Sequence, residues 1–436
     1  MLRTQEKTQV IPTSENTRIL YICDLNLTHG GAQKITFKTL ECLSKDFNLY
    51  IYSPDEPSQE SLELLNDLHL YSVFDAEFNI EKIIEIINKF NIEYMLIQWE
   101  NPTWVSSSYL IKRKLNVKVI LMIHNLPYID SPVNNIIKNW FILTLLRILK
   151  LGASLFFGSI GKNNVLQDGG ESYEKSFTVK EFLKKGKDTP LKIYLTYKGI
   201  KYADGIICMG PASAYYLNKY LNINKSMYVV KHNAAVDVKN KIINKIYKYD
   251  FVFMAAYLQV EKGIIDLLDI FYYVKNNFSN DPNIIIIGRF FDSKTQNDFY
   301  KKVDRLNLRK NVIMAGFVTE EEKIEILSSS RIFLYPSRKD NFSISLAEAL
   351  SYGCPSVVFD LPFSWQFNST AVFRIPYKKL DKMATTSLAL LKISYDKPDE
   401  FEKLCESALN DILNQFTWKK TCEDQINAIK TLEDFE

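Results

Sequence analysis

The sequence predicts an α/β protein built from two doubly wound domains, each a parallel sheet with helices on both faces. Its 436 residues exceed what one hydrophobic core usually organises, and the 47% hydrophobic fraction can supply two cores. Short apolar runs also alternate with helical patterns, and this alternation starts twice along the chain. Such repeated alternation is typical of parallel α/β domains.

The first alternation predicts the N-terminal domain. The run RILYIC at 18–23 predicts a strand, and a Gly-Gly pair then leads into a helical pattern at 32–44. The next strands are expected at 48–52, 94–98, 117–124, 205–209 and 227–231. These runs are apolar throughout rather than alternating, as expected for parallel strands that are covered on both faces.

The second alternation predicts the C-terminal domain. Strands are expected at 250–255, 283–287, 311–315, 331–335 and 355–359, and helices at 262–277, 320–328 and 344–352. We therefore divide the chain into a flexible tail (1–17), an N-terminal domain (18–240) with an insertion or mobile loop at 159–190, a C-terminal domain (241–415) and a C-terminal helix (416–436) that packs back on the N-terminal domain. Ligands of parallel sheets bind beyond the carboxyl ends of the strands, so we expect a central cleft between the domains.

Composition excludes several classes of function and location. With 54 Lys and Arg against 51 Asp and Glu, the net charge of +3 gives no field that would favour nucleic acid. The first 17 residues lack the apolar core of a signal peptide, and cations interrupt the apolar stretch 136–157, so no run could span a bilayer. The six cysteines are scattered singly, without zinc or disulfide-framework spacing. We expect a reducing, cytoplasmic location.

Three strand ends carry candidate phosphate ligands. Gly30 and Gly31 lie between the first strand and helix, where they form either a tight turn or a loop whose amides approach a diphosphate. The GxGxxG fingerprint of nicotinamide dehydrogenases is absent there. Lys262 begins the first helix of the second domain, and Gly288-Arg289 follows a buried strand. Each cation could neutralise a phosphate or simply be solvated or surface-paired.

The segment YPSRKDNFSISLAEALSYGCPSVV is the most informative part of the chain. A strand ends in Pro-Ser, and a polar loop then carries Asp340 into a helix that carries Glu348. Carboxylates accept hydrogen bonds from the adjacent hydroxyls of sugars and of ribose. A helix that merely favours acidic residues near its N-terminus would explain Asp340 but not an acid among the small and apolar residues around Glu348.

Taken in order, seven segments resemble the retaining glycosyltransferase family 4, the glycosyl transferases group 1, which has the GT-B fold of two Rossmann-like domains. They are GGAQ, ADGIICMG, HNAAVD, EKGIIDLL, IIIIGR, NVIMAGFV and the acid-loop segment quoted above, and the resemblance extends from residue 18 to residue 418. The resemblance implies a hexosyltransferase that uses a nucleotide-diphosphate sugar of the UDP or GDP type and requires neither metal nor other cofactor. The sugar would leave with retention of configuration, and closure of the domains would exclude water.

The resemblance also assigns roles to individual residues. The paired acids correspond to Asp340 and Glu348, and the donor-phosphate Arg and Lys correspond to Tyr257 and Lys262, so the Arg is missing and Arg289 is its candidate replacement. The loop that is usually Gly-Phe-Gly reads Asn341-Phe342-Ser343, and a Ser of the family is Gly210. The implied catalytic residues are His124, Asp340 and Lys262. The implied donor-binding residues are Gly30, Gly31, Lys262, Gly288, Arg289, Phe317, Asp340, Asn341, Phe342, Ser343 and Glu348.

The expected partners are a nucleotide sugar and a glycan acceptor, which is either free or lipid-linked. Residues 136–157 combine apolar bulk with spaced cations, so they form either an interfacial helix on the inner face of the membrane or a helix packed within the N-terminal domain. The alternatives are a non-catalytic partner subunit of the same fold, a sugar phosphorylase or nucleotide-sugar epimerase, and a nucleic-acid glucosyltransferase.

Overall fold

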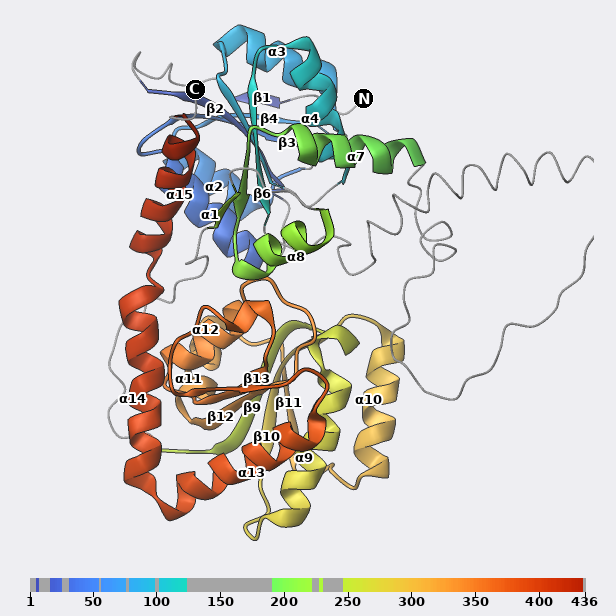
Figure 1. Cartoon of the computed structure of the whole chain (residues 1–436), viewed down its shortest axis with the longest axis vertical. Coiled ribbons are helices and arrows are strands. Elements are labelled where there is room, and N and C mark those ends of the chain that lie inside the picture. Colours follow the sequence, from blue (N-terminus) through green and yellow to red (C-terminus); the bar gives the residue numbers. More distant parts are fainter. Residues whose placement is uncertain are drawn as a thin grey trace, which may run out of the picture.

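The computed structural model consists of two α/β domains stacked along the long axis of the molecule (Figure 1). It describes residues 5–7, 16–25, 31–54, 56–75, 78–98, 102–123, 190–221, 227–229 and 246–433. The insertion at 159–190, apart from Pro190, and the amphipathic stretch at 136–157 lie outside these residues.

The N-terminal domain holds an eight-stranded sheet in the order β1-β4-β3-β2-β5-β6-β7-β8, in which only β1 pairs antiparallel. Its strands are β1 (Gln5–Lys7), β2 (Arg18–Ile22), β3 (Asn48–Ser53), β4 (Tyr71–Phe74), β5 (Tyr94–Gln98), β6 (Lys118–Ile123), β7 (Gly205–Cys208) and β8 (Met227–Val229). Its helices are α1 (Gly31–Leu43), α2 (Gln59–Asp67), α3 (Ile80–Phe90), α4 (Pro102–Lys114), α7 (Pro190–Tyr202) and α8 (Pro211–Leu221).

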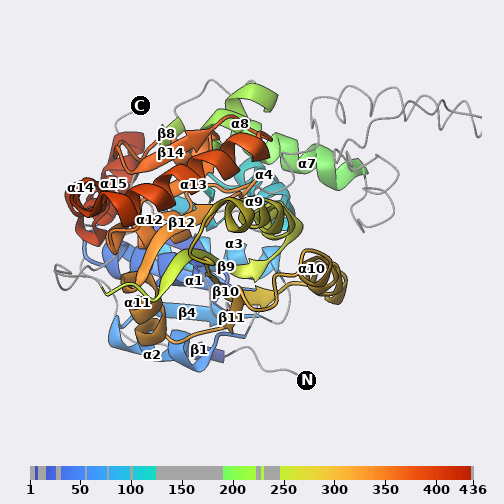
Figure 2. The ribbon, with the colours of Figure 1, turned by 90° about the horizontal axis from the view of Figure 1, so that it is seen from below.

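The C-terminal domain holds a six-stranded, all-parallel sheet in the order β11-β10-β9-β12-β13-β14. Its strands are β9 (Tyr249–Leu258), β10 (Ile284–Phe290), β11 (Val312–Gly316), β12 (Ser330–Tyr335), β13 (Ser356–Phe359) and β14 (Val372–Ile375). Its helices are η1 (Val260–Lys262), α9 (Ile264–Asn277), α10 (Ser293–Arg305), α11 (Glu320–Ser328), α12 (Ile344–Ser351), η2 (Pro362–Ser364), α13 (Leu380–Asp396) and α14 (Pro398–Gln415). Helices α9 and α13 pack side by side on this sheet (Figure 2).

The predicted strands and helices are present with ends shifted by a few residues. The largest shifts are in β9 and β10, which continue to Leu258 and Phe290, each three residues beyond the prediction. The predicted helix 262–277 is split, because Gly263 adopts a left-handed conformation (φ 79°) between η1 and α9. Helices α13 and α14 and strand β14, which the sequence reading did not identify, complete the C-terminal domain.

The C-terminal helix α15 (Trp418–Glu433) returns to the N-terminal domain (Figure 1). It packs on α1 and β7, where its side chains Ile429 and Leu432 join the buried cluster of the N-terminal sheet. Gly205 in β7 permits this approach, because a Cβ atom there would overlap the side chain of Leu432. The chain therefore crosses between the domains twice.

A disulfide joins Cys42 of α1 to Cys422 of α15. The Cα atoms lie 5.3 Å apart, within the range of natural disulfides, although 380 residues separate the two cysteines along the chain. The scattered spacing of the cysteines did not indicate this pair, because the pairing depends on the return of α15 to the N-terminal domain.

Alkylation of the unfolded, unreduced chain should label four cysteines, because Cys23, Cys208, Cys354 and Cys405 are not in the disulfide. Reduction before alkylation should raise the number to six. Intact-protein mass spectrometry measures both states, and six labels without reduction would show that Cys42 and Cys422 are not joined.

Candidate functional site

The candidate site lies where the strand order of the C-terminal sheet reverses. Strands β9 and β12 are neighbours, but the chain leaves β9 toward β10 on one side and leaves β12 toward β13 on the other. The loops that follow β9 and β12 therefore diverge, and ligands of open parallel sheets bind at such a switch point. Lys262 lies in the first loop and Asp340 in the second.

Lys262 and Asp340 form an ion pair with a distance of 3.0 Å between Nζ and Oδ2. The Tyr335 hydroxyl donates to the same carboxylate oxygen (2.7 Å), and the backbone N–H of Asn341 donates to Oδ1 (3.0 Å). Both charged side chains are largely buried. Asp340 is thus held by an ammonium, a hydroxyl and an amide.

The environment keeps Lys262 protonated. Burial by itself disfavours the ammonium, but the Asp340 carboxylate and the Tyr335 hydroxyl outweigh burial and raise the pKa of Lys262 above its ordinary value. Because the pKa is raised on folding, the resulting stabilisation is complete below the ordinary lysine pKa of about 10.4 and is lost only at higher pH. At neutral pH the site therefore presents a fixed positive charge.

Glu348, on the buried face of α12, pairs with a lysine of the neighbouring helix. Its Oε1 lies 2.7 Å from the ammonium of Lys323 on α11, which also bonds Glu320 at 2.8 Å. Burial disfavours the Lys323 ammonium, yet Glu348 and Glu320 raise its pKa. Glu348 is thus a largely buried carboxylate with a neutralising partner.

Arg289 lies at the end of β10, opposite Tyr257 of β9 in the strand register. Its guanidinium donates to the Tyr257 hydroxyl (2.6 Å) and lies 4.8 Å from the centre of the Tyr257 ring and 5.7 Å from that of Phe317. The rings of Tyr257 and Phe317 are 37% and 52% exposed, so this cation-aromatic cluster is open to a ligand.

Two of the three side chains in the loop after Asp340 are buried against protein partners. Phe342 is buried against the rings of Phe367 and Phe416. The carboxamide of Asn341 is buried and bonds the N-terminal domain at Ser213. Both side chains fix the loop, and their predicted part in donor binding stays a prediction.

Ser343 brings the loop into α12 with a left-handed backbone (φ 67°). Its hydroxyl is buried without a hydrogen-bond partner, and no side chain caps the first N–H groups of α12. The N-terminus of a helix that lacks a cap is a favourable site for an anion, because its N–H groups and the helix dipole face outward.

The remaining predicted residues are placed as follows. Gly288 has φ 135°, and a Cβ atom there would overlap the carbonyl oxygen of Ala255, so β10 approaches β9 closely just before Arg289. Gly31 is the first residue of α1. Gly30 and His124 lie outside the described residues.

Four site residues escaped the sequence reading. Tyr335 and Arg338 lie within the acid-loop segment, where Arg338 forms a two-pronged pair with Asp266 in the first turn of α9 (Nε–Oδ2 2.8 Å). The only sequence signal for Lys323 was its place in the acidic run EEEK, where its ammonium could pair with a neighbouring carboxylate. Ser213 gave no signal, because its partner lies in the other domain.

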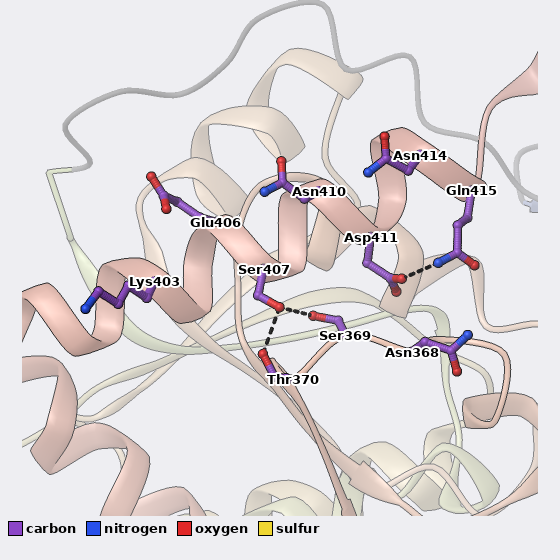
Figure 3. Close-up of a pocket in the computed structure, with 10 residues that line it drawn as sticks. All are labelled: Asn368, Ser369, Thr370, Lys403, Glu406, Ser407, Asn410, Asp411, Asn414 and Gln415. Atoms are coloured by element: carbon purple, nitrogen blue, oxygen red, sulfur yellow. Dashed lines mark hydrogen bonds between the residues drawn. The ribbon is translucent and has the colours of Figure 1, made fainter.

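A polar groove of about 540 Å³ lies elsewhere, between α14 and residues 368–370 (Figure 3). These residues precede β14, so the groove is at the amino end of that strand, opposite to the candidate site. The Ser407 hydroxyl bonds those of Ser369 (3.0 Å) and Thr370 (2.8 Å), and Asp411 accepts from Gln415 (2.7 Å). The contacts of Ser407 attach α14 to the domain, and none of the predicted site residues lines the groove.

Residues 237–384 match the family model for glycosyl transferases group 1. This match contains Lys262, Arg289, Asp340 and Glu348. The C-terminal part of the chain is therefore similar to the group 1 glycosyl transferases. A relative in Escherichia coli, UDP-Gal:alpha-D-GlcNAc-diphosphoundecaprenol alpha-1,3-galactosyltransferase, is 28% identical over 201 residues, which are 45% of this chain and 48% of the relative. The match thus spans about half the length of this curated relative.

Solved structures agree with the two-domain fold along nearly the whole chain. A glycosyltransferase of Rickettsia africae superposes with a TM-score of 0.65 at 14% identity, covering 97% of this chain and all of the other. Anabaena Alr3699/HepE in complex with UDP gives 0.66 at 10% identity, covering 95% and 100%. The predicted GT-B fold is therefore confirmed.

Replacing Lys262 by Met should lower the free energy of unfolding by about 1–3 kcal/mol, because the substitution leaves the Asp340 carboxylate largely buried without a cation. The matched control is Lys294→Met, which removes an exposed ion pair with Asp298 and should cost below about 0.5 kcal/mol. Urea unfolding of the full chain measures both. Equal losses would show that the Lys262 pair is no more than a surface contact.

Two glycines with similar backbone conformations test the packing of the two loops. Gly263 and Gly316 have φ 79° and 74°, but a Cβ atom on Gly263 would overlap the Pro336 carbonyl oxygen, whereas Gly316 has open space. Gly316→Ala should lose roughly 1 kcal/mol from its left-handed backbone. Gly263→Ala should lose clearly more in the same unfolding measurement, and equal losses would contradict the close approach of the loops.

Proposed function

We propose that this protein is a group 1 glycosyltransferase, a retaining and metal-independent hexosyltransferase that uses a nucleotide-diphosphate sugar. The observation that carries the proposal is the Lys262–Asp340 ion pair at the switch point of the C-terminal sheet, beside the uncapped N-terminus of α12. A cation, free amides and carboxylates on two diverging loops are the groups that a diphosphate linked to two sugars requires.

The leaving diphosphate would bind to Lys262 and to the first N–H groups of α12. Lys262 is a fixed positive charge, and the unpartnered Ser343 hydroxyl is at the start of the helix. Charge develops on the diphosphate as the sugar departs, so groups that are already oriented stabilise the transition state without reorganisation. Gly30 and Gly31 would supply further amides from the N-terminal domain.

The two acids would hold the two sugar ends of the donor. Glu348 would accept from the ribose hydroxyls, with Lys323 neutralising its charge, and Asp340 would accept from hydroxyls of the transferred hexose. Arg289, supported by Tyr257, would contact a phosphate oxygen in place of the Arg that the family has at position 257. The exposed ring of Phe317 would pack against the nucleotide.

The reaction breaks the bond between the anomeric carbon and the diphosphate oxygen and forms one to an acceptor oxygen on the same face. The acceptor hydroxyl proton passes to the departing phosphate oxygen, so no external base is consumed. His124 would lie beside the transferred sugar. Lys262 and the amides of α12 would supply the charge neutralisation that a metal ion gives to other transferases.

The acceptor would be a glycan, either free or linked to a lipid. The name of the Escherichia coli relative specifies a UDP-galactose donor and a lipid-diphosphate acceptor, which supports a UDP-sugar and a lipid-linked glycan here. Among the helices that the structure describes, none is long and apolar enough to cross a membrane. Contact with the inner face of the membrane would therefore be peripheral, through residues 136–157.

Nucleotide-dependent thermal stabilisation tests the donor site. UDP or GDP, or one of their sugar conjugates, should raise the melting temperature by a few degrees, since ligand at 100 times its Kd adds about 2.7 kcal/mol to a folded state that alone binds it. Glu348→Ala and Lys262→Ala should each abolish the shift. Lys294→Ala, which removes an exposed pair, should retain it.

Product analysis separates the enzyme from a non-catalytic partner subunit. The nucleotide sugar that stabilises the chain should be hydrolysed slowly and transferred to a glycan acceptor, with the anomeric configuration retained. Binding without hydrolysis or transfer would favour the non-catalytic subunit, for which the Tyr257 replacement is the specific argument. Absence of stabilisation by any nucleotide sugar would contradict the donor site itself.

A further inference from the structure

The Asn341 carboxamide connects the acid loop of the C-terminal domain to the N-terminal domain. Its Oδ1 accepts from both the backbone N–H (3.0 Å) and the hydroxyl (2.7 Å) of Ser213, and its Nδ2 donates to the Ile123 carbonyl (3.4 Å). Asn341 is 6% exposed and Ser213 is completely buried. The contact is therefore a desolvated set of hydrogen bonds between the two domains.

The geometry is that of a helix N-cap supplied by another domain. Ser213 is the third residue of α8, and a cap normally accepts from the N–H of the second or third residue. The residue before α8 is Gly210, which has no side chain with which to cap, and the first residue, Pro211, has no N–H. Asn is among the best capping residues, and here it arrives from the opposite domain.

Gly210 is also what makes this arrangement sterically feasible. A Cβ atom on Gly210 would lie 2.9 Å from both Oδ1 and the backbone oxygen of Asn341. Gly210 therefore adjoins Asn341, and the capping side chain is on the C-terminal domain while the position before α8 has none.

We propose that Asn341 is a positioning residue, which caps α8 from the other domain and thereby couples the arrangement of the domains to the placement of Asp340. The coupling follows from the chain itself. Asp340 is fixed to the C-terminal domain by Lys262 and Tyr335, while the next residue is fixed to the N-terminal domain. The part of the inference that concerns the transferred sugar rests on the proposed function, whereas the cap does not.

Exchanging the two residues separates capping from coupling. Asn341→Gly should expose the Ser213 amide, so that its hydrogen exchange becomes roughly fivefold faster, the effect of losing a cap worth about 1 kcal/mol. The double variant Gly210→Ser with Asn341→Gly restores a capping side chain within α8 and should restore the protection of Ser213. It should not restore the protection of residues 340–343, which stay detached from the N-terminal domain.

Asn341→Asp tests the cap alone, because it retains the oxygen that accepts from Ser213 but loses the Nδ2 donor to the Ile123 carbonyl, so it should keep the Ser213 amide protected. Gly210→Ser alone should disturb both Ser213 and residues 340–343, since its side chain meets Asn341. Unchanged exchange at Ser213 in Asn341→Gly would overturn the cap. Restoration of residues 340–343 in the double variant would overturn the coupling. These outcomes are read by hydrogen exchange of the full chain and require no substrate.

Activity and nucleotide binding distinguish this inference from the proposed function. With UDP-galactose as probe, the double variant should keep the UDP-dependent thermal shift and KM close to wild type while kcat falls about tenfold, since Asp340 is then no longer positioned against the other domain. An unchanged kcat in the double variant would show that Asn341 caps α8 but does not position Asp340. If wild type neither binds UDP nor uses UDP-galactose, the proposed use of a UDP sugar fails, while the exchange experiment still decides the cap.

Discussion

The contact between Lys262 and Asp340 is the constraint on which the site depends. The chain leaves the neighbouring strands β9 and β12 in opposite directions, and the ion pair joins the two loops that follow these strands. Both groups are largely buried, so each charge needs the other. The pair therefore holds two opposite charges in a fixed arrangement at the switch point of the sheet.

Further contacts hold the loop that follows β9 against the loop that follows β12. The Arg338 backbone N–H donates to the Glu261 carbonyl, and its guanidinium grips Asp266 in the first turn of α9. The absence of a side chain at Gly263 lets the Pro336 carbonyl approach. None of these groups is among the proposed donor ligands. They fix the backbones of the two loops relative to each other, so the distance between Lys262 and Asp340 does not depend only on their own flexible side chains.

The sequence predicts the sheets well because their signal is local. The run IIIIG before Arg289 and the run RIFLY before Pro336 can only be buried strands, and the residues that follow such strands meet at one edge of the sheet. The same reasoning could not predict the packing of the Asn341 and Phe342 side chains. Their partners, Ser213 in one case and Phe367 and Phe416 in the other, are set by tertiary packing that no local pattern encodes. The Cys42–Cys422 pairing escaped for the same reason, since it requires α15 to return to the first domain.

The departure at Tyr257 is best understood through the register of the sheet. Arg289 stands opposite Tyr257 on the adjacent strand, and parallel neighbours are about 4.8 Å apart, which is less than the reach of an arginine side chain. An arginine on β10 can therefore place its guanidinium close to where an arginine on β9 would place it, provided that another side chain orients it. Tyr257 does so through its hydroxyl and its ring face. Under the proposed function, Arg289 replaces the phosphate-binding arginine of the family, and Tyr257 orients it. The Tyr257 ring must therefore be retained for Arg289 to bind phosphate.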